Sequence, residues 1–153
     1  DDEDLLKLFE TNFRGYHWMM QAFLPALVKN GHSSIINVAS VAGVVALRLQ
    51  VAFVAAKAAV IKMTEAMACE LGPMGVRVNV VSPGSTTTEE NRKAFYNGDN
   101  SHTHLAARIT SFIPQARIGE ASEIADAVLF LASDAASYVN GHNLIVDGGW
   151  TAD

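Results

Sequence analysis

Cysteine is scarce in this sequence, since Cys69 is the only one among 153 residues. A single cysteine excludes an intramolecular disulfide and a cluster of thiolate metal ligands. Cys69 lies in the middle of an apolar stretch with a helical period. We therefore expect a packed, buried thiol with no chemical role.

Positive charge is also scarce. The chain has 11 Lys and Arg residues against 16 Asp and Glu, a formal net charge of −5, and no run of basic residues. This balance argues against nucleic acid or an anionic membrane surface as a partner. No apolar stretch approaches the roughly 20 residues that span a bilayer, and the acidic start DDEDLLKLFE lacks the apolar core of a signal peptide. We expect a cytoplasmic protein, with an organelle as the alternative.

Half of the residues are hydrophobic and 18% are charged, which is typical of a globular domain. From Asp2 to about Lys29, apolar residues recur at intervals of three and four, which predicts one long amphipathic helix with Pro25 near its last turns. SSIINVAS (33–40) then reads as a buried strand. A second helix is predicted from Val51 to Leu71, where GPMG ends it.

The second half of the chain continues this alternation. VRVNVVSPG (76–84) is a predicted strand, residues 86–104 form a polar loop, and a helix is expected over 122–133 with Ser122 as its N-cap. NLIVDGG (143–149) is the last predicted strand. Continuous apolar strands that alternate with helices indicate an α/β fold with parallel strands. No linker divides the chain, so we expect residues 1–153 to belong to a single domain.

Five stretches follow one another in an order and spacing that point to one family. They are INVASVAG, FVAAKAAV, ELGPMGVRVNVVSPG, RIGEASEIADAVLFLASD and VNGHNLIVDGG. Together they resemble the C-terminal half of the short-chain dehydrogenase/reductase family, with the weakest match over residues 86–115. The resemblance implies a Rossmann-like doubly wound parallel sheet. It also implies an NAD(P)-dependent oxidoreductase that interconverts an alcohol and a carbonyl.

The resemblance also implies catalytic residues, because the family uses an Asn–Ser–Tyr–Lys tetrad. Asn12 matches the asparagine that holds a proton-relay water, and Ser40 matches the serine that binds the substrate oxygen. Lys57 matches the lysine that binds the nicotinamide ribose and lowers the pKa of the tyrosine. The tyrosine should stand four residues before Lys57, where this chain has Phe53.

The spacing of this pair has a physical reason, since residues four apart share one face of a helix. A cation beside a phenol favours the phenolate, which can then act as a general acid or base near neutral pH. Phe53 keeps the ring but lacks the oxygen that would move the proton, so we expect impaired catalysis. Taken alone, Phe53 and Lys57 would instead indicate a core aromatic and an exposed lysine.

The cofactor expected from the resemblance is NAD or NADP. Lys57, the Pro83-Gly84 turn, Thr86 and Thr88 match positions that contact the nicotinamide half of the cofactor. The glycine-rich GxxxGxG turn that would hold the pyrophosphate does not occur in the sequence. The chain therefore corresponds to the C-terminal portion of the fold, and the N-terminal dinucleotide-binding half is absent. SSIINVAS should then have an unpaired edge, and we expect the chain to need that half from the same or another polypeptide.

The polar segment offers weaker signals. His102 and His104 have no third ligand nearby, so no metal site is predicted. Four apolar residues in the predicted lid over residues 86–115 favour an apolar or bulky small-molecule substrate; they are Phe95, Tyr96, Phe112 and Ile113.

Two other functions stay open at this point. Phe53 is also compatible with a non-catalytic family member that binds a nucleotide or stabilises a partner subunit. A scaffold role is the other alternative, because the helices that carry Asn12 and Lys57 build the dimer interface in this family. We expect a homodimer or homotetramer.

Overall fold

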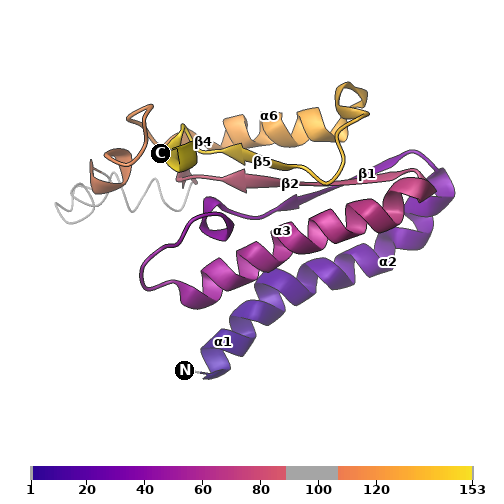
Figure 1. Ribbon diagram of the computed structural model, residues 1–153, viewed down its shortest axis with the longest axis horizontal. Coiled ribbons are helices and arrows are strands. Elements are labelled where there is room, and N and C mark those ends of the chain that lie inside the picture. The colour runs from indigo at the N-terminus through magenta and orange to yellow at the C-terminus, as the bar shows by residue number, and fades with distance from the viewer. Residues whose placement is uncertain (1, 89–106, 153) are drawn as a thin grey trace.

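Three parallel strands form the central sheet of the protein (Figure 1). The computed structural model describes residues 2–88 and 107–152. Strands β1 (Ser33–Val38), β2 (Val76–Pro83) and β5 (Asn143–Val146) lie in the order β1-β2-β5. β1 and β5 both pair with β2 in parallel, with Val38 opposite Val81 and Val80 opposite Asn143. The predicted α/β architecture and its three parallel strands are therefore confirmed.

The N-terminal helix differs from the single regular helix predicted for residues 2–29. It comprises α1 (Asp2–Phe9), a π-helical turn (Glu10–Arg14) and α2 (Gly15–Asn30), which ends at Gly31 in the left-handed conformation with φ 68°. The apolar period did not reveal the π-helical turn, because one extra residue changes the spacing of side chains only locally. Asn12 lies within this turn.

Helix α3 (Val51–Leu71) has the predicted bounds, but its single thiol is not packed as expected. Cys69 is exposed, whereas Ala68 and Leu71 are buried in the core. Successive helical residues point about 100° apart, so Cys69 falls on the solvent side although its neighbours are apolar. The prediction of a buried Cys69 was wrong.

Helix α6 (Ala121–Ala132) begins one residue earlier than predicted, and Ser122 is not its N-cap. The cap is Glu120, whose side chain accepts a hydrogen bond from the backbone of Glu123, while Glu123 accepts one from the backbone of Glu120. Glu120 also belongs to a short strand, β4 (Gly119–Glu120), which pairs with β3 (Thr86–Thr87). This pairing holds Glu120 in an extended conformation and so fixes where the helix begins.

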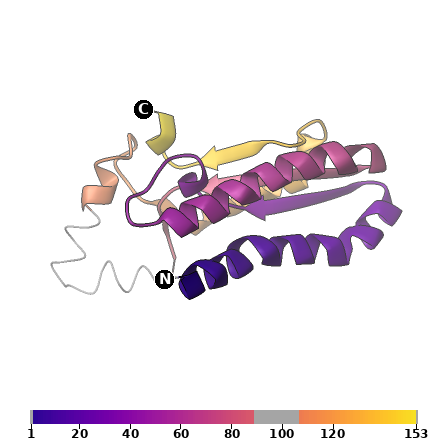
Figure 2. The ribbon, with the colours of Figure 1, turned by 60° about the horizontal axis from the view of Figure 1, so that its bottom comes forward.

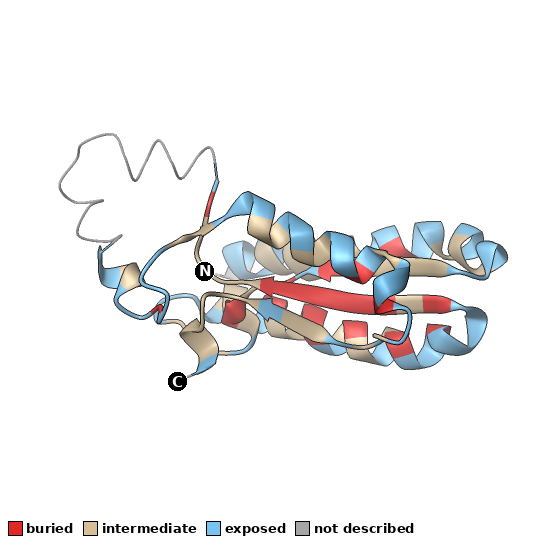
Figure 3. Cartoon of the chain, turned by 90° about the horizontal axis from the view of Figure 1, so that it is seen from above, coloured by how far each residue is buried: buried red, intermediate tan, exposed pale blue. Residues whose placement is uncertain are grey.

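Helices cover both faces of the sheet, with α2 and α3 on one side and α6 on the other (Figure 1). β2 lies at the centre and is buried along most of its length (Figure 3). Val80 packs against Val60 and Ile61 of α3, whereas the next residue, Val81, packs against Leu131 of α6. This alternation explains why the strand is apolar on both faces.

β1 lies at one edge of the sheet, next to the N-terminal helices (Figure 2). Within residues 2–88 and 107–152, its outer edge pairs with no other strand. Several large apolar side chains on α1 and α2 are exposed, namely Leu5, Leu6, Trp18, Met19 and Phe23. None of the helices in the described part of the chain combines the length and the apolar character of a membrane span.

Candidate functional site

The predicted site residues Ser40, Pro83 and Gly84 lie at one edge of the sheet, where β1 and β2 end. The backbone N–H of Ala39 donates to Val81 O at 2.8 Å, and that of Gly84 donates to Val146 O at 2.9 Å. The sheet therefore brings the residue after β1 and the turn after β2 to the same side. Ligands of open α/β sheets bind outside this carboxyl edge.

Ser40 begins a short 3₁₀-helix, Val41–Gly43, that packs directly on α3. Its Oγ accepts a hydrogen bond from the backbone N–H of Ala42 at 3.1 Å. A Cβ added at Gly43 would lie 2.8 Å from the carbonyl carbon of Lys57 and 2.9 Å from its oxygen. Only glycine allows this approach, so Gly43 fixes the turn that starts at Ser40 against the helix that carries Lys57.

The side chain of Lys57 is buried, with 8% of the residue exposed. Its Nζ donates to Val38 O at 3.2 Å and to the hydroxyl of Tyr16 at 3.5 Å. Burial lowers the pKa of Lys57, because the charged form loses hydration. Both hydrogen-bond partners are neutral, and the third N–H of the ammonium has no partner among the described residues. This donor fits a ribose hydroxyl, which is the group that the resemblance assigns to Lys57.

Phe53 lies beside Lys57, as the spacing of four residues predicted. The Lys57 Nζ is 5.7 Å from the centre of the Phe53 ring and 5.4 Å from that of Tyr16. Both distances lie within the range of cation–π attraction. The hydroxyl that contacts Lys57 therefore comes from Tyr16 on α2, and the ring at the family's tyrosine position contributes none.

Tyr16 was not among the predicted site residues. It lies in the apolar helical stretch predicted for residues 2–29, four residues after Asn12. Its hydroxyl donates to Val38 O at 2.8 Å, and burial raises its pKa. The contact joins positions 16 and 38, and a helical period cannot reveal such a pairing.

Asn12 forms a hydrogen bond within its own helix. Its Nδ2 donates to Leu8 O at 3.3 Å, one turn earlier. The side chain is half-buried, and the π-helical turn around it packs next to α3, the helix of Lys57. The role of Asn12 in holding a relay water stays a prediction.

The predicted cofactor residues after β2 are tied to the rest of the fold. The Thr86 hydroxyl donates to Gly84 O at 3.2 Å, and Thr86 pairs with Gly119 in the short β3–β4 ribbon, which the sequence did not predict. Thr88 follows this ribbon and is exposed. A Cβ added at Gly84 would lie 2.8 Å from the Cα of Asp147, so the turn packs closely on the segment after β5. These contacts fix the start of the predicted lid.

An ion pair holds the β4 side of this ribbon. The Arg117 guanidinium donates to both carboxylate oxygens of Glu123, at 2.6 and 2.8 Å, and Glu123 also accepts from the backbone N–H of Glu120 at 2.8 Å. The hydrogen bonds from Arg117 and then from the Glu120 backbone lower the pKa of Glu123 to about 2. The pair links the segment before β4 to the first turn of α6.

Four of the residues considered for the polar segment lie outside the described part of the chain; they are Phe95, Tyr96, His102 and His104. Of the two described residues expected in the lid, Phe112 is exposed and Ile113 is buried. A Cβ added at Gly148 would lie 2.7 Å from Ile113 Cγ2, so Ile113 packs against the fold.

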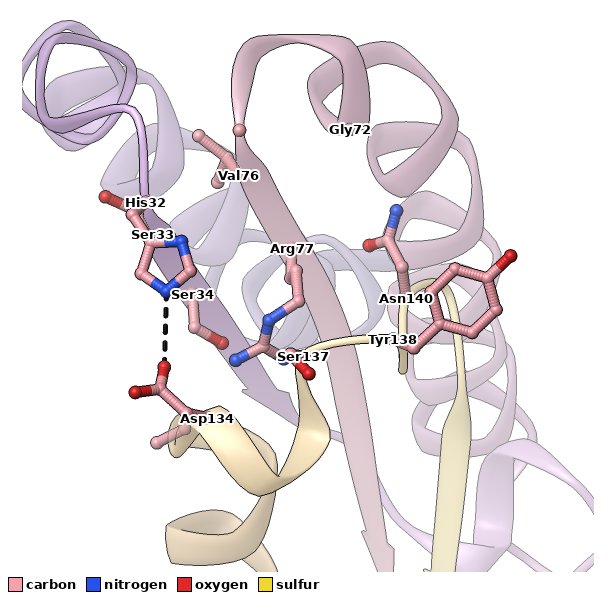
Figure 4. Close-up of a pocket in the computed structure, with 12 residues that line it drawn as sticks. His32, Ser33, Ser34, Gly72, Val76, Arg77, Asp134, Ser137, Tyr138 and Asn140 are labelled. Carbon is pink, nitrogen blue, oxygen red and sulfur yellow. Dashed lines mark hydrogen bonds and ion pairs between the residues drawn. The ribbon is translucent and has the colours of Figure 1, made fainter.

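A cavity of about 550 Å³ lies at the other end of the sheet and contains none of the predicted site residues (Figure 4). It is bordered by the amino ends of β1 and β2 and by the end of α6. His32 Nε2 lies 3.2 Å from the carboxylate of Asp134 there. The Arg77 guanidinium donates to the carbonyls of Leu131 and Ser133, at 2.9 and 3.2 Å. Arg77 therefore secures the C-terminal end of α6, which is a structural role.

Comparison with curated proteins shows close relatives. The chain is 41% identical over 153 residues to galactitol 2-dehydrogenase (L-tagatose-forming) from Cereibacter sphaeroides, which covers 99% of this chain and 58% of the relative. It is 39% identical over 145 residues to the NAD-dependent glycerol dehydrogenase of Listeria innocua, covering 95% of this chain and 55% of that protein. The chain thus spans little more than half the length of these relatives.

A solved structure and a family model are also similar to this chain. The crystal structure of a gluconate 5-dehydrogenase from Burkholderia cenocepacia, in complex with NADP and tartrate, superposes with a TM-score of 0.90 at 31% identity and covers 100% of this chain and 58% of that one. That structure contains NADP, and the glycerol dehydrogenase is NAD-dependent. Both similarities support NAD or NADP as the cofactor. Residues 1–151 match the family described as Enoyl-(Acyl carrier protein) reductase. The chain belongs to the short-chain dehydrogenase/reductase family.

Proposed function

We propose that this chain is the C-terminal, catalytic part of an NAD(P)-dependent oxidoreductase that interconverts an alcohol and a carbonyl on a small molecule. The observation that carries the proposal is the environment of Lys57. A lysine buried among neutral partners, at the carboxyl edge of a parallel sheet and with one donor free, is costly unless it binds something. Family membership and the dehydrogenase relatives support the same reaction class.

Each predicted residue has a task in this reaction. The bound cofactor supplies or accepts the hydride. The third N–H of Lys57 donates to a ribose hydroxyl, and the Ser40 hydroxyl donates to the substrate oxygen. Asn12 holds a water behind Lys57. The Pro83-Gly84 turn and the hydroxyls of Thr86 and Thr88 bind the carboxamide.

Phe53 is the position that limits the reaction, because its ring cannot donate or accept a proton. General acid–base catalysis typically contributes about 10²- to 10⁴-fold to a rate. We expect Phe53→Tyr in the complete gene product to raise kcat on carbonyl substrates by about this factor, since Lys57 already lies beside the ring. Cofactor affinity should stay the same. Turnover is measured by NAD(P)H absorbance with several small ketones and aldehydes.

The matched control is Phe130→Tyr, which adds the same oxygen to an exposed ring on α6. It should change neither turnover nor cofactor affinity. If Phe53→Tyr gives no turnover with any substrate while the cofactor still binds, the enzyme proposal is refuted. That result would favour the second candidate, a non-catalytic subunit that binds the nucleotide or stabilises a partner, for which Phe53 itself is the supporting observation.

We also propose that the protein is a homodimer or homotetramer. The exposed apolar side chains of α1 and α2 support this, because they form a surface that a second copy could cover. Light scattering of the complete gene product measures the assembly, and Leu6→Glu should shift it towards the monomer. A wild-type protein that is monomeric at micromolar concentration would refute this part of the proposal.

A further inference from the structure

Tyr16 and Lys57 share one backbone acceptor at the end of β1. The Tyr16 hydroxyl donates to Val38 O at 2.8 Å, and Lys57 Nζ donates to the same oxygen at 3.2 Å. A carbonyl oxygen has two lone pairs and can accept both hydrogen bonds. The Tyr16 oxygen and the Lys57 nitrogen are themselves 3.5 Å apart. The three atoms form a closed polar triangle between α2, α3 and β1.

Apolar groups pack against this triangle from the side of the helices, whereas Val38 itself is exposed. Tyr16 packs against a buried cluster that includes Ala39 and Val60, and the Lys57 Nζ faces the rings of Tyr16 and Phe53. No carboxylate forms an ion pair with Lys57 within residues 2–88 and 107–152. The position of the ammonium therefore depends on the Val38 carbonyl and on the tyrosine that shares it.

We propose that Tyr16 is a positioning residue for Lys57. Its hydroxyl holds the ammonium at the Val38 carbonyl, so that the remaining N–H points to the cofactor ribose. This inference rests on the proposed function, because it assumes that Lys57 binds the cofactor. The Tyr16 hydroxyl also explains how the Lys57 ammonium keeps its position, although the Phe53 ring has no oxygen to accept a hydrogen bond from it.

A role of Tyr16 as the missing proton donor fits the geometry less well. Its hydroxyl proton is already donated to Val38 O, and burial raises its pKa. A phenol that acted as a general acid near neutral pH would need a lowered pKa. The geometry therefore favours positioning over proton transfer.

A double-mutant cycle in the complete gene product tests the proposal. NADH and NADPH affinities are measured by cofactor fluorescence for the wild type, Tyr16→Phe, Lys57→Met and the double variant. We expect Tyr16→Phe to weaken the better-bound cofactor by about 3- to 10-fold when Lys57 is present, which corresponds to the loss of about one neutral hydrogen bond. With Met at position 57 it should have no effect, because a residue that acts through Lys57 shows full coupling. Tyr138→Phe, at an exposed phenol, is the matched control.

A spectroscopic measurement separates positioning from general packing. The ε-methylene proton signals of Lys57, assigned by their loss in Lys57→Met, should show ring-current shifts from Phe53 and Tyr16. Tyr16→Phe keeps its ring but should move these signals towards the value of a free lysine, whereas Tyr138→Phe should not. Unmoved signals, or additive effects of the two substitutions on affinity, would overturn the proposal.

The cycle also separates this inference from the proposed function. If Lys57→Met leaves cofactor affinity unchanged, the assignment of Lys57 to the ribose fails, and the inference fails with it. If Lys57→Met weakens binding but Tyr16→Phe does not, only the inference on Tyr16 is refuted.

Discussion

Replacing Gly43 by alanine tests the contact that joins the Ser40 turn to the helix of Lys57. The new Cβ would lie 2.8 Å from the carbonyl carbon of Lys57, 2.9 Å from its oxygen and 2.8 Å from Ile61 Cδ1. The isoleucine can move, but the backbone of α3 cannot yield without shifting the helix. Overpacking of this kind costs about 1–3 kcal/mol, and the loss of glycine's freedom in the unfolded chain offsets about 0.4–1 kcal/mol. We expect a net loss of about 1–2 kcal/mol in the free energy of unfolding.

The assay is urea unfolding of the complete gene product, combined with cofactor titration. The Ser40 turn and Lys57 must move apart in Gly43→Ala, so cofactor affinity should fall together with stability. Gly15→Ala is the matched control, because its Cβ would be 3.6 Å from Glu10 O, an ordinary contact. As a helical position it should gain about 0.5–1 kcal/mol. Equal stability and unchanged cofactor affinity in Gly43→Ala would refute the reasoning.

Two further predictions concern stability. Because Arg117 and the Glu120 backbone lower the pKa of Glu123 to about 2, the stabilisation from the Glu123 carboxylate is present above about pH 4.5 and is lost as the pH falls towards 2. Glu123→Gln should remove that part of the acid dependence, which acid unfolding curves measure. Curves of equal slope for the wild type and the variant would contradict this prediction. Asn79 is fully buried, and its side chain donates to Val139 O and accepts from the His142 N–H. Asn79→Ala should therefore lower the free energy of unfolding, measured in urea, by about 2–4 kcal/mol. A loss below about 1 kcal/mol would mean that water replaces the amide.

The sequence predicted the central sheet well because its signals are local. SSIINVAS and VRVNVVSPG are short apolar runs bounded by turn residues, and α3 has the bounds that its composition and the following GPMG indicated. The β3–β4 ribbon could not be predicted in this way. Its two pairs join positions 86–87 to 119–120, and two-residue strands leave no periodicity to detect.

At the candidate site, too, contacts within one helix could be predicted, and contacts between distant segments could not. The proximity of Phe53 and Lys57 follows from helical spacing alone, and the structure confirms it. The contact of Gly43 with the Lys57 backbone and that of Tyr16 with Val38 depend on how helices lie on the sheet. These contacts join backbone and side-chain atoms of four elements, and no single stretch of sequence contains the information.

The π-helical turn at Glu10–Arg14 determines which side chains of α1 point towards α3. A π-turn contains one residue more than an α-helical turn, so α1 is rotated by about 100° relative to a continuous helix in register with α2. Deleting one residue within the turn would restore a regular helix, and α1 would then present a different set of side chains to α3. A one-residue gap at this point in an alignment would therefore mark a change of helix face, and residues before the gap would not share the surroundings of those aligned with them.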